Sequence, residues 1–189
     1  AWAEGRTGYP MVDACMRALS ATGWINFRMR AMLVSFASYH LWLHWREPAL
    51  YLARLFTDYE PGIHYSQVQM QSGTTGINSV RIYNPIKQGI DHDPLGVFIK
   101  KWVPELQDME LRNLHTPWLS TEKIGDYPLP IVDERTGRSS AMQKIYDVRK
   151  GASHRARSTH VLKQHGSRRL AKKRSPKKSK KDPISGSLF

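Results

Sequence analysis

The spacing of apolar residues near the start of the chain predicts a helix over residues 11 to 21, MVDACMRALSA. The residues that share its apolar face are Val12, Cys15, Met16 and Leu19. Gly23 follows directly and is expected to end this helix. Residues 24 to 45, WINFRMRAMLVSFASYHLWLHW, are apolar on nearly every side of a helix. We therefore expect them to form one buried helix at the centre of the core.

Further helices are expected along the rest of the chain. One runs from Pro48, which is tolerated in a first turn, to about Thr57. Another follows Asp93, with this residue as its N-cap and Pro94 at its first position. Its expected buried face consists of Val97, Phe98, Trp102 and Val103. A last helix is expected over residues 140 to 149.

Residues 58 to 85 are rich in Gly, Gln, Ser and Thr and show no sustained helical or strand period. We interpret them as a long ordered loop, and loops of that length inside a compact domain are usually functional. Nothing in the chain requires a β-sheet. The sequence therefore predicts an all-α fold with long ordered loops.

The positive charge is confined to one end of the chain. The formal net charge is +13, yet residues 1 to 148 hold 15 Lys and Arg against 15 Asp and Glu. Residues 149 to 189 hold 14 basic residues against Asp182 alone. We predict a helical domain over 1–148 and a basic, largely disordered tail over 149–189. The tail serves either as a solubilising segment or as an arm that contacts nucleic-acid phosphates, with anionic lipid or a targeting role as further alternatives.

The cysteine and hydropathy patterns limit the remaining classes. A single cysteine, Cys15, excludes an internal disulfide and a multi-cysteine zinc site. No apolar run reaches the roughly 18 residues of a membrane span, and the first residues do not resemble a signal peptide. We expect a soluble, intracellular, cytoplasmic protein without membrane contact, or a nuclear one in a eukaryote.

Two histidine patterns resemble metal sites. His40 and His44 have the i,i+4 spacing of zinc ligands on a helix, but no credible third ligand accompanies them. Partly buried core histidines explain them better. His92 lies between Asp91 and Asp93, and helix capping explains that arrangement more simply. We predict no metal site.

Four blocks in order carry a family resemblance. They are GRTGYPMVDACMRALSATGWINFRMR (5–30), HWRE (44–47), RIYNPIKQG (81–89) and DPLGVFIKKWVPEL (93–106). Together they resemble the carboxyl-terminal half of the FAD-binding domain of the DNA photolyase/cryptochrome family, from about residue 2 to 148. The resemblance implies FAD as the cofactor. The family's antenna-binding domain and earlier flavin-binding helices have no counterpart here, so the antenna pigment stays undefined and we expect a fragment or truncated product.

The resemblance also implies positions for site residues. It puts Trp24 and Arg30 beside the flavin, Asp58 as the partner of Arg30, Glu60 as a second acidic residue near the cofactor, and His64 facing flavin N5. Phe27 stands where the family has an asparagine near the flavin. Arg28 and Arg81 match arginines that hold DNA phosphates.

The two arginines of the predicted helix can be separated by geometry alone. Arg28 and Arg30 lie about 200° apart around a helix axis, so they cannot serve one face. A buried Arg30 needs a carboxylate, and Asp58 is the natural candidate. The alternative to flavin contact is a structural ion pair between two helices.

The segment HYSQVQM (64–70) departs from the Asn-Asn-Gly-Gly-Trp-Gln-Trp pattern typical of cyclobutane-dimer photolyases. Val68 stands where the pattern has the first Trp of the electron relay, and Met70 where it has the Trp that packs on the lesion. Trp45 still matches a distal relay position, with Trp42 and Tyr39 as another route or as core aromatics. His64 either modulates protonation at flavin N5 or hydrogen-bonds a loop carbonyl.

The resemblance leads to two main functional hypotheses. The first is a deoxyribodipyrimidine photo-lyase, a carbon–carbon lyase in which excited reduced FAD passes an electron to a pyrimidine dimer. Damaged DNA is then the partner of a monomeric protein, with phosphates held by Arg28, Arg81 and the tail. The alternative is a cryptochrome-like blue-light photoreceptor without repair activity, which the altered 64–70 segment favours. A third possibility is an inert fragment.

Overall fold

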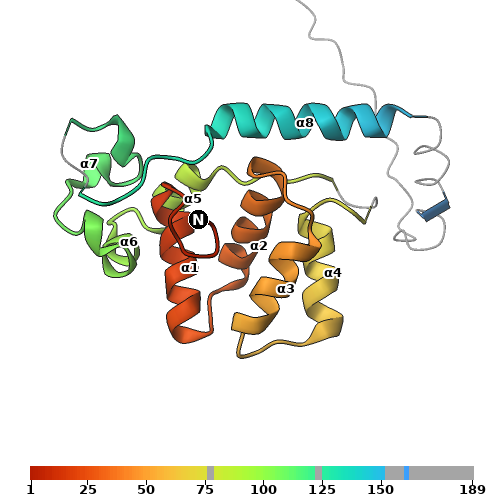
Figure 1. Cartoon of the computed structure of the whole chain (residues 1–189), viewed down its shortest axis with the longest axis horizontal. Helices are drawn as coiled ribbons and strands as arrows, with labels where there is room; N and C mark the ends of the chain where they lie inside the picture. The colour runs from red at the N-terminus through yellow and green to blue at the C-terminus, as the bar shows by residue number, and fades with distance from the viewer. Residues whose placement is uncertain (76–78, 122–124, 152–159, 162–189) are drawn as a thin grey trace, which may run out of the picture.

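The computed structural model describes residues 1–75, 79–121, 125–151 and 160–161 of the chain (Figure 1). All regular elements within these residues are helical, which confirms the predicted fold class. The α-helices are α1 (Pro10–Thr22), α2 (Phe27–Ser35), α3 (Arg46–Leu55), α4 (Pro61–Gln71), α5 (Pro85–His92), α6 (Val97–Trp102), α7 (Leu111–Leu114) and α8 (Glu134–Lys150). Short 3-10 turns span Pro104–Leu106 and Pro117–Leu119. Apart from residues 149–151 and 160–161, the predicted basic tail lies outside the described residues.

The helices pack around α1 and α2. The first of these contacts α2, α5 and α6, and α2 in turn contacts α4, which also packs on α3. Helix α8 lies across the ends of the bundle and contacts the segment that follows α2 (Figure 1). No helix in the described ranges is long and apolar enough to cross a membrane.

The turn GRTGYP is fixed by a buried carboxylate on α1. Asp13 accepts hydrogen bonds from the Thr7 amide at 2.7 Å, the Thr7 hydroxyl at 2.7 Å and the Gly8 amide at 3.0 Å. The Tyr127 hydroxyl, from a distant segment, donates to the same carboxylate at 2.6 Å. Burial raises the pKa of Asp13, although these hydrogen bonds oppose the increase. Asp13 therefore ties the start of α1 to the segment before α8.

Gly8 is required in this turn for two reasons. Its φ of 81° is in the left-handed region. In addition, a β-carbon at this position would lie 2.5 Å from the backbone of Leu129. The Thr7 carbonyl accepts a hydrogen bond from the Ile131 amide at 3.0 Å, which holds the two segments together. The turn thus serves as a docking site for residues near 130 as well as a helix start.

The single helix expected over residues 24–45 is wrong in its bounds. Asn26 caps α2 by accepting from the Met29 amide at 3.0 Å, and a π-helical turn, Phe36–His40, follows the helix. In this turn the Leu41 amide bonds the Phe36 carbonyl, a wider spacing than an α-helix has. Residues 41–45 are outside the helix, and Trp42 has a φ of 53°. The apolar pattern continues past the helix because Leu41 and Trp45 still pack on the core.

The long loop expected over residues 58–85 is also wrong, because it contains helix α4. Glu60 caps α4 by accepting from the Ile63 amide at 2.6 Å, and Pro61 occupies the first turn. Only Val68 of this helix is fully buried, so its sequence has no wide apolar stripe to indicate a helix. Helix α5 begins just past this segment, at Pro85, where Asn84 caps it by accepting from the Lys87 amide at 2.9 Å.

The helix expected after Asp93 exists, but it starts at Val97, and Gly96 is its N-cap. The Asp93 carboxylate still accepts from the amides of Phe98, at 3.1 Å, and Ile99, at 2.8 Å. The expected buried face is only partly correct: Ile99 and Val103 are buried, Phe98 and Trp102 are half-buried, and Val97 is 68% exposed. The helix also begins one turn later than expected, so Val97 is its first residue.

The outer helices α3 and α8 differ less from expectation. Helix α3 begins at Arg46, close to the expected start, with Pro48 in its first turn. Helix α8 begins at Glu134, six residues before the expected start, because Asp133 caps it through the Thr136 amide at 2.8 Å. Residues 134–139 are polar and have no apolar stripe, so the sequence does not indicate a helix there. Among the core residues, Cys15 is a free, fully buried thiol.

Candidate functional site

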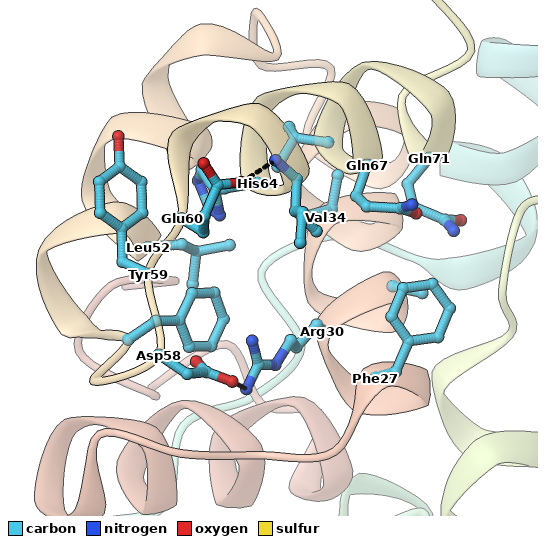
Figure 2. A pocket seen from close by; sticks show the side chains of 14 residues that line it. Phe27, Arg30, Val34, Leu52, Asp58, Tyr59, Glu60, His64, Gln67 and Gln71 are labelled. Carbon is cyan, nitrogen blue, oxygen red and sulfur yellow. Dashed lines mark hydrogen bonds and ion pairs between the residues drawn. The ribbon is translucent and has the colours of Figure 1, made fainter.

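An open pocket of about 330 Å³ lies between α2 and α4, with the end of α3 and the α3–α4 connection completing its wall (Figure 2). Its size is within the range of small-molecule sites, ~300–1,000 Å³. The apolar residues of the lining are Phe27, Ala31, Val34, Leu52, Phe56, Ile63 and Val68. The polar ones are Arg30, Asp58, Tyr59, Glu60, His64, Gln67 and Gln71. A large apolar surface with a few convergent polar groups suits a flat, partly polar ligand.

Arg30 is held rigidly at one side of the pocket. Its Nη2 donates to the Asp58 carboxylate at 2.9 Å, and its Nε donates to the Ile25 carbonyl at 2.8 Å. The guanidinium carbon lies 4.1 Å from the centroid of the Phe56 ring. The predicted Arg30–Asp58 pair is therefore confirmed. The Arg30 hydrogen bond lowers the pKa of Asp58. Because Asp58 is half exposed, the pair orients the guanidinium more than it stabilises the fold.

His64 lies deeper in the same wall, on α4. Its Nε2 is 2.8 Å from the carbonyl oxygen of Ala49 on α3, so this nitrogen carries a proton and donates. The rings of Phe56, Tyr59 and Tyr65 surround the imidazole edge-on, with centroids 5.2 to 5.9 Å away. Of the two expected roles, hydrogen bonding to a carbonyl is the one the structure shows, although that carbonyl belongs to a helix and not to a loop. In the neutral ring, Nδ1 is then an acceptor.

The other predicted cofactor residues are divided between the pocket and its surroundings. Phe27 and Glu60 line the pocket, and Glu60 is at the same time the N-cap of α4. Trp24 is 57% exposed and is not among the lining residues. Arg28 is exposed on α2, two positions from Arg30. The structure thus brings five of the six predicted cofactor residues together and leaves Trp24 outside.

A second, smaller hollow of about 100 Å³ adjoins the pocket. It is lined by Met70, Gln71, Ser79 and Arg81. Gln71 lines both hollows, so the two meet at this residue. The residues predicted for the lesion and for phosphate contact, Met70 and Arg81, therefore lie together, in a hollow that shares Gln71 with the pocket.

The predicted relay aromatics occupy a separate part of the molecule. Trp45 is half-buried and packs on the core, and it lines a third hollow with Tyr39 and Trp42. Tyr39 is buried, whereas Trp42 is 46% exposed. The interpretation of Tyr39 as a core aromatic agrees with this burial. The relay role of Trp45 stays a prediction.

The two histidines with metal-like spacing do not share a helical face. His40 is the last residue of the π-helical turn and is buried, as expected, but His44 lies beyond the helix and is exposed. Within the described residues, no three His, Cys, Asp or Glu side chains lie close enough to hold a metal ion.

Sequence reasoning missed several residues of the pocket. Val34, Leu52 and Tyr59 form much of its wall, and Gln67 presents an amide there. The signal that identifies Gln67 is helical: it follows His64 by three positions on α4, and both line the pocket. That signal is lost when residues 58–85 are interpreted as a loop.

Comparison with known proteins identifies the domain. A family model described as the FAD binding domain of DNA photolyase matches residues 1–147. Among curated relatives, a deoxyribodipyrimidine photo-lyase of Escherichia coli is 38% identical over 156 residues, which are 80% of this chain and 33% of the relative. A cryptochrome DASH of Xenopus laevis is 35% identical over 179 residues, 89% of this chain and 34% of the relative.

Solved structures agree with the sequence comparison. A crystal structure of an archaeal photolyase from Sulfolobus tokodaii with two FAD molecules matches with a TM-score of 0.74 and 37% identity, over 78% of this chain and 34% of that one. A Synechocystis cryptochrome matches with a TM-score of 0.71 and 30% identity, over 75% of this chain and 32% of that one. The chain spans about a third of the length of these relatives.

Proposed function

Because this chain belongs to the family of DNA photolyase FAD-binding domains, we propose that it supplies the flavin-holding pocket of a light-driven DNA-repair lyase. The observation that carries the proposal is the convergence of Phe27, Arg30, Asp58, Glu60 and His64 on one pocket. These residues come from α2, α4 and the connection before α4, so the fold brings residues from separate elements to one place.

The pocket's chemistry fits a flavin ring. Apolar side chains on α2, α3 and α4 offer a surface for a flat aromatic system, and Arg30 offers N–H donors for its carbonyl or phosphate oxygens. The Oε1 atom of Gln67 is buried in this wall without a hydrogen-bond partner among the described residues. An orphaned acceptor in a pocket wall is expected where a ligand supplies the donor.

When bound, reduced FAD would supply the light-driven electron transfer that opens the cyclobutane ring of a pyrimidine dimer. The residues of this chain bind and orient. Arg30, fixed by Asp58 and Ile25, would position the ring, and His64, whose Nε2 donates to the Ala49 carbonyl, would offer Nδ1 to it as a hydrogen-bond acceptor. The apolar wall, in which Leu52 and Val68 are buried, would exclude water from the ring.

The DNA side of the proposal involves a different surface. Met70 and Arg81 line the hollow next to the flavin pocket, where an extruded base would lie close to the ring. Arg28 and Arg81 are exposed and would contact phosphates, as would the basic residues of the tail. Such contacts would carry a strong salt dependence. We propose that the protein acts on DNA as a monomer, with residues 1–148 as the flavin unit and 149–189 as a phosphate-binding arm.

A cryptochrome-like photoreceptor is the second candidate, and the altered 64–70 segment favours it, because Met70 stands where the photolyase pattern packs a Trp on the lesion. Val68 in the same segment replaces the first Trp of the electron relay. Rapid photoreduction needs an easily oxidised aromatic side chain beside the flavin, and valine cannot serve. Val68 is 3% exposed and lies in the pocket wall, so no aromatic ring occupies that position. Trp45, which we propose as a distal relay residue, would then need another aromatic side chain between it and the flavin.

Light-dependent repair tests the first candidate against the second. The protein is loaded with FAD, reduced chemically so that the relay is not needed, and mixed with an oligonucleotide that carries one thymine dimer. We expect the dimer to disappear under blue light and to persist in darkness. Stable flavin binding without any loss of the dimer would contradict repair and favour the photoreceptor.

A further inference from the structure

Gln67 carries an unexplained polar atom in the pocket wall. Its Oε1 is buried and accepts no hydrogen bond from any described residue. The side chain nevertheless lines the pocket, next to Gln71 at the side nearest Phe27 (Figure 2). Leaving a buried acceptor unpaired is costly, so native structures seldom keep one without a partner in protein, water or ligand.

The position of Gln67 on α4 is that of a ligand-facing residue. His64, Gln67 and Gln71 are spaced three and four residues apart, so they lie on one face of the helix, and all three line the pocket. Gln69 lies on another face and is not among the lining residues. The amide of Gln67 is therefore directed to the pocket by the helix itself.

Two neighbouring positions differ from the photolyase pattern in the size of their side chains: the first is larger here and the second is smaller. Where that pattern has Gly followed by Trp, this chain has Gln67 followed by Val68. The wall thus loses an aromatic ring and gains a carboxamide at adjacent residues. The exchange replaces an apolar contact by a hydrogen-bonding group within the same pocket.

The amide of Gln67 complements the guanidinium of Arg30 in the same pocket. Arg30 has only donors, whereas a glutamine oxygen is an acceptor. A flavin presents both kinds of group, since its ring carbonyls accept while its imide N–H and ribityl hydroxyls donate. Rotation about the terminal bond of a glutamine is nearly free, so the oxygen can turn toward such a donor.

We propose that Gln67 is a flavin-contacting residue, which accepts a hydrogen bond from the imide N–H of the ring or from a hydroxyl of the ribityl chain. The proposal rests on the flavin-binding function inferred for this pocket. It assigns Gln67 a role in affinity and in ring electronics, because a hydrogen bond at the imide edge alters the absorption of the ring.

The test compares Gln67→Leu with the matched control Gln69→Leu, both in the full chain. Titration with FAD, followed by flavin fluorescence, is expected to show roughly ten-fold weaker binding for Gln67→Leu and unchanged binding for Gln69→Leu. If the donor is the imide N–H, the visible absorption bands of bound flavin should also shift in Gln67→Leu and not in Gln69→Leu. Gln67→Met keeps the unbranched shape of glutamine and carries the same prediction if the leucine variant does not fold.

Flavin analogues then identify the donor. Lumiflavin has no ribityl hydroxyls, and its imide-methylated derivative has no N–H in the ring. The effect of Gln67→Leu should vanish with the analogue that lacks the group Gln67 binds. Equal affinity of wild type and Gln67→Leu for FAD would overturn this inference and leave flavin binding intact. A wild-type chain that binds none of these flavins would overturn the proposed function and the inference together.

Discussion

Replacing Arg30 by methionine is expected to weaken flavin binding by roughly ten- to a hundred-fold, the range for one or two lost hydrogen bonds from a charged donor. The guanidinium is pre-oriented by Asp58, Ile25 and the Phe56 ring, so its remaining N–H groups are available to a ligand without reorganisation. Fluorescence titration with FAD measures the change.

The fold itself should tolerate this replacement, because Asp58 is half exposed and keeps its hydration when Arg30 is absent. Arg30→Lys should be intermediate, since an ammonium keeps the charge but lacks the planar fork. Arg54→Met removes an exposed arginine from α3 outside the pocket and should leave flavin affinity unchanged. Unaltered affinity in Arg30→Met would make the Arg30–Asp58 pair purely structural.

Acidification is expected to destabilise the wild-type fold more than a His40→Leu variant, by roughly 3 kcal/mol between about pH 7.5 and pH 4. The His40 side chain is fully buried, is stacked on Phe36 and has no hydrogen bond to a described residue. Burial and the nearby charge of Arg138 lower its pKa to about 4. The Glu134 carboxylate, 3.8 Å from Nε2, does not reverse this shift.

The sign of this effect follows from where the proton binds. Below about pH 6.5 the unfolded chain protonates His40, whereas the folded chain does so only near pH 4, so stability falls as pH decreases through that window. Urea unfolding at several pH values measures it. His92→Gln, at an exposed histidine, should keep the wild-type slope. Parallel slopes for wild type and His40→Leu would mean that His40 is protonated in the fold, with Glu134 as its partner.

The parts of the fold that could be predicted from the sequence have strong local signals. Helix α1 has a clear apolar stripe and a glycine directly after it, and these two features predict the helix and its end. Helix α4 has neither. Its only fully buried residue is Val68. The helix is stabilised at its start by the Glu60 cap and along its length by packing on α2 and α3. Tertiary contacts, which no local pattern records, determine this helix.

The opposite error occurred over residues 24–45. Apolar residues continued beyond the helix, so periodicity alone extended it past the π-helical turn at Phe36–His40. Residues in irregular backbone bury apolar side chains as well, as Leu41 and Trp45 do. The apolar residues did not indicate the conformation of the backbone there, and two of them beyond the helix, Trp42 and Leu43, are 46% and 37% exposed.

The site was predicted mainly through family resemblance, supported by charge pairing. Geometry indicated the Arg30–Asp58 pair, since a partly buried arginine needs a carboxylate. Gln67 gives no signal in the sequence because residues 58–85 show no helical period, and Asp13 gives none because a buried carboxylate is recognised only through its partners. One of these partners, Tyr127, lies 114 residues away in the sequence. Such long-range hydrogen bonds leave no local pattern.

The most direct test of this account is a crystal structure of the chain grown with FAD. We predict that the flavin ring occupies the pocket between α2 and α4, with Arg30 and His64 in contact with it and the Gln67 amide at its polar edge. A ring bound elsewhere on the protein, with this pocket empty, would contradict the assignment of the site.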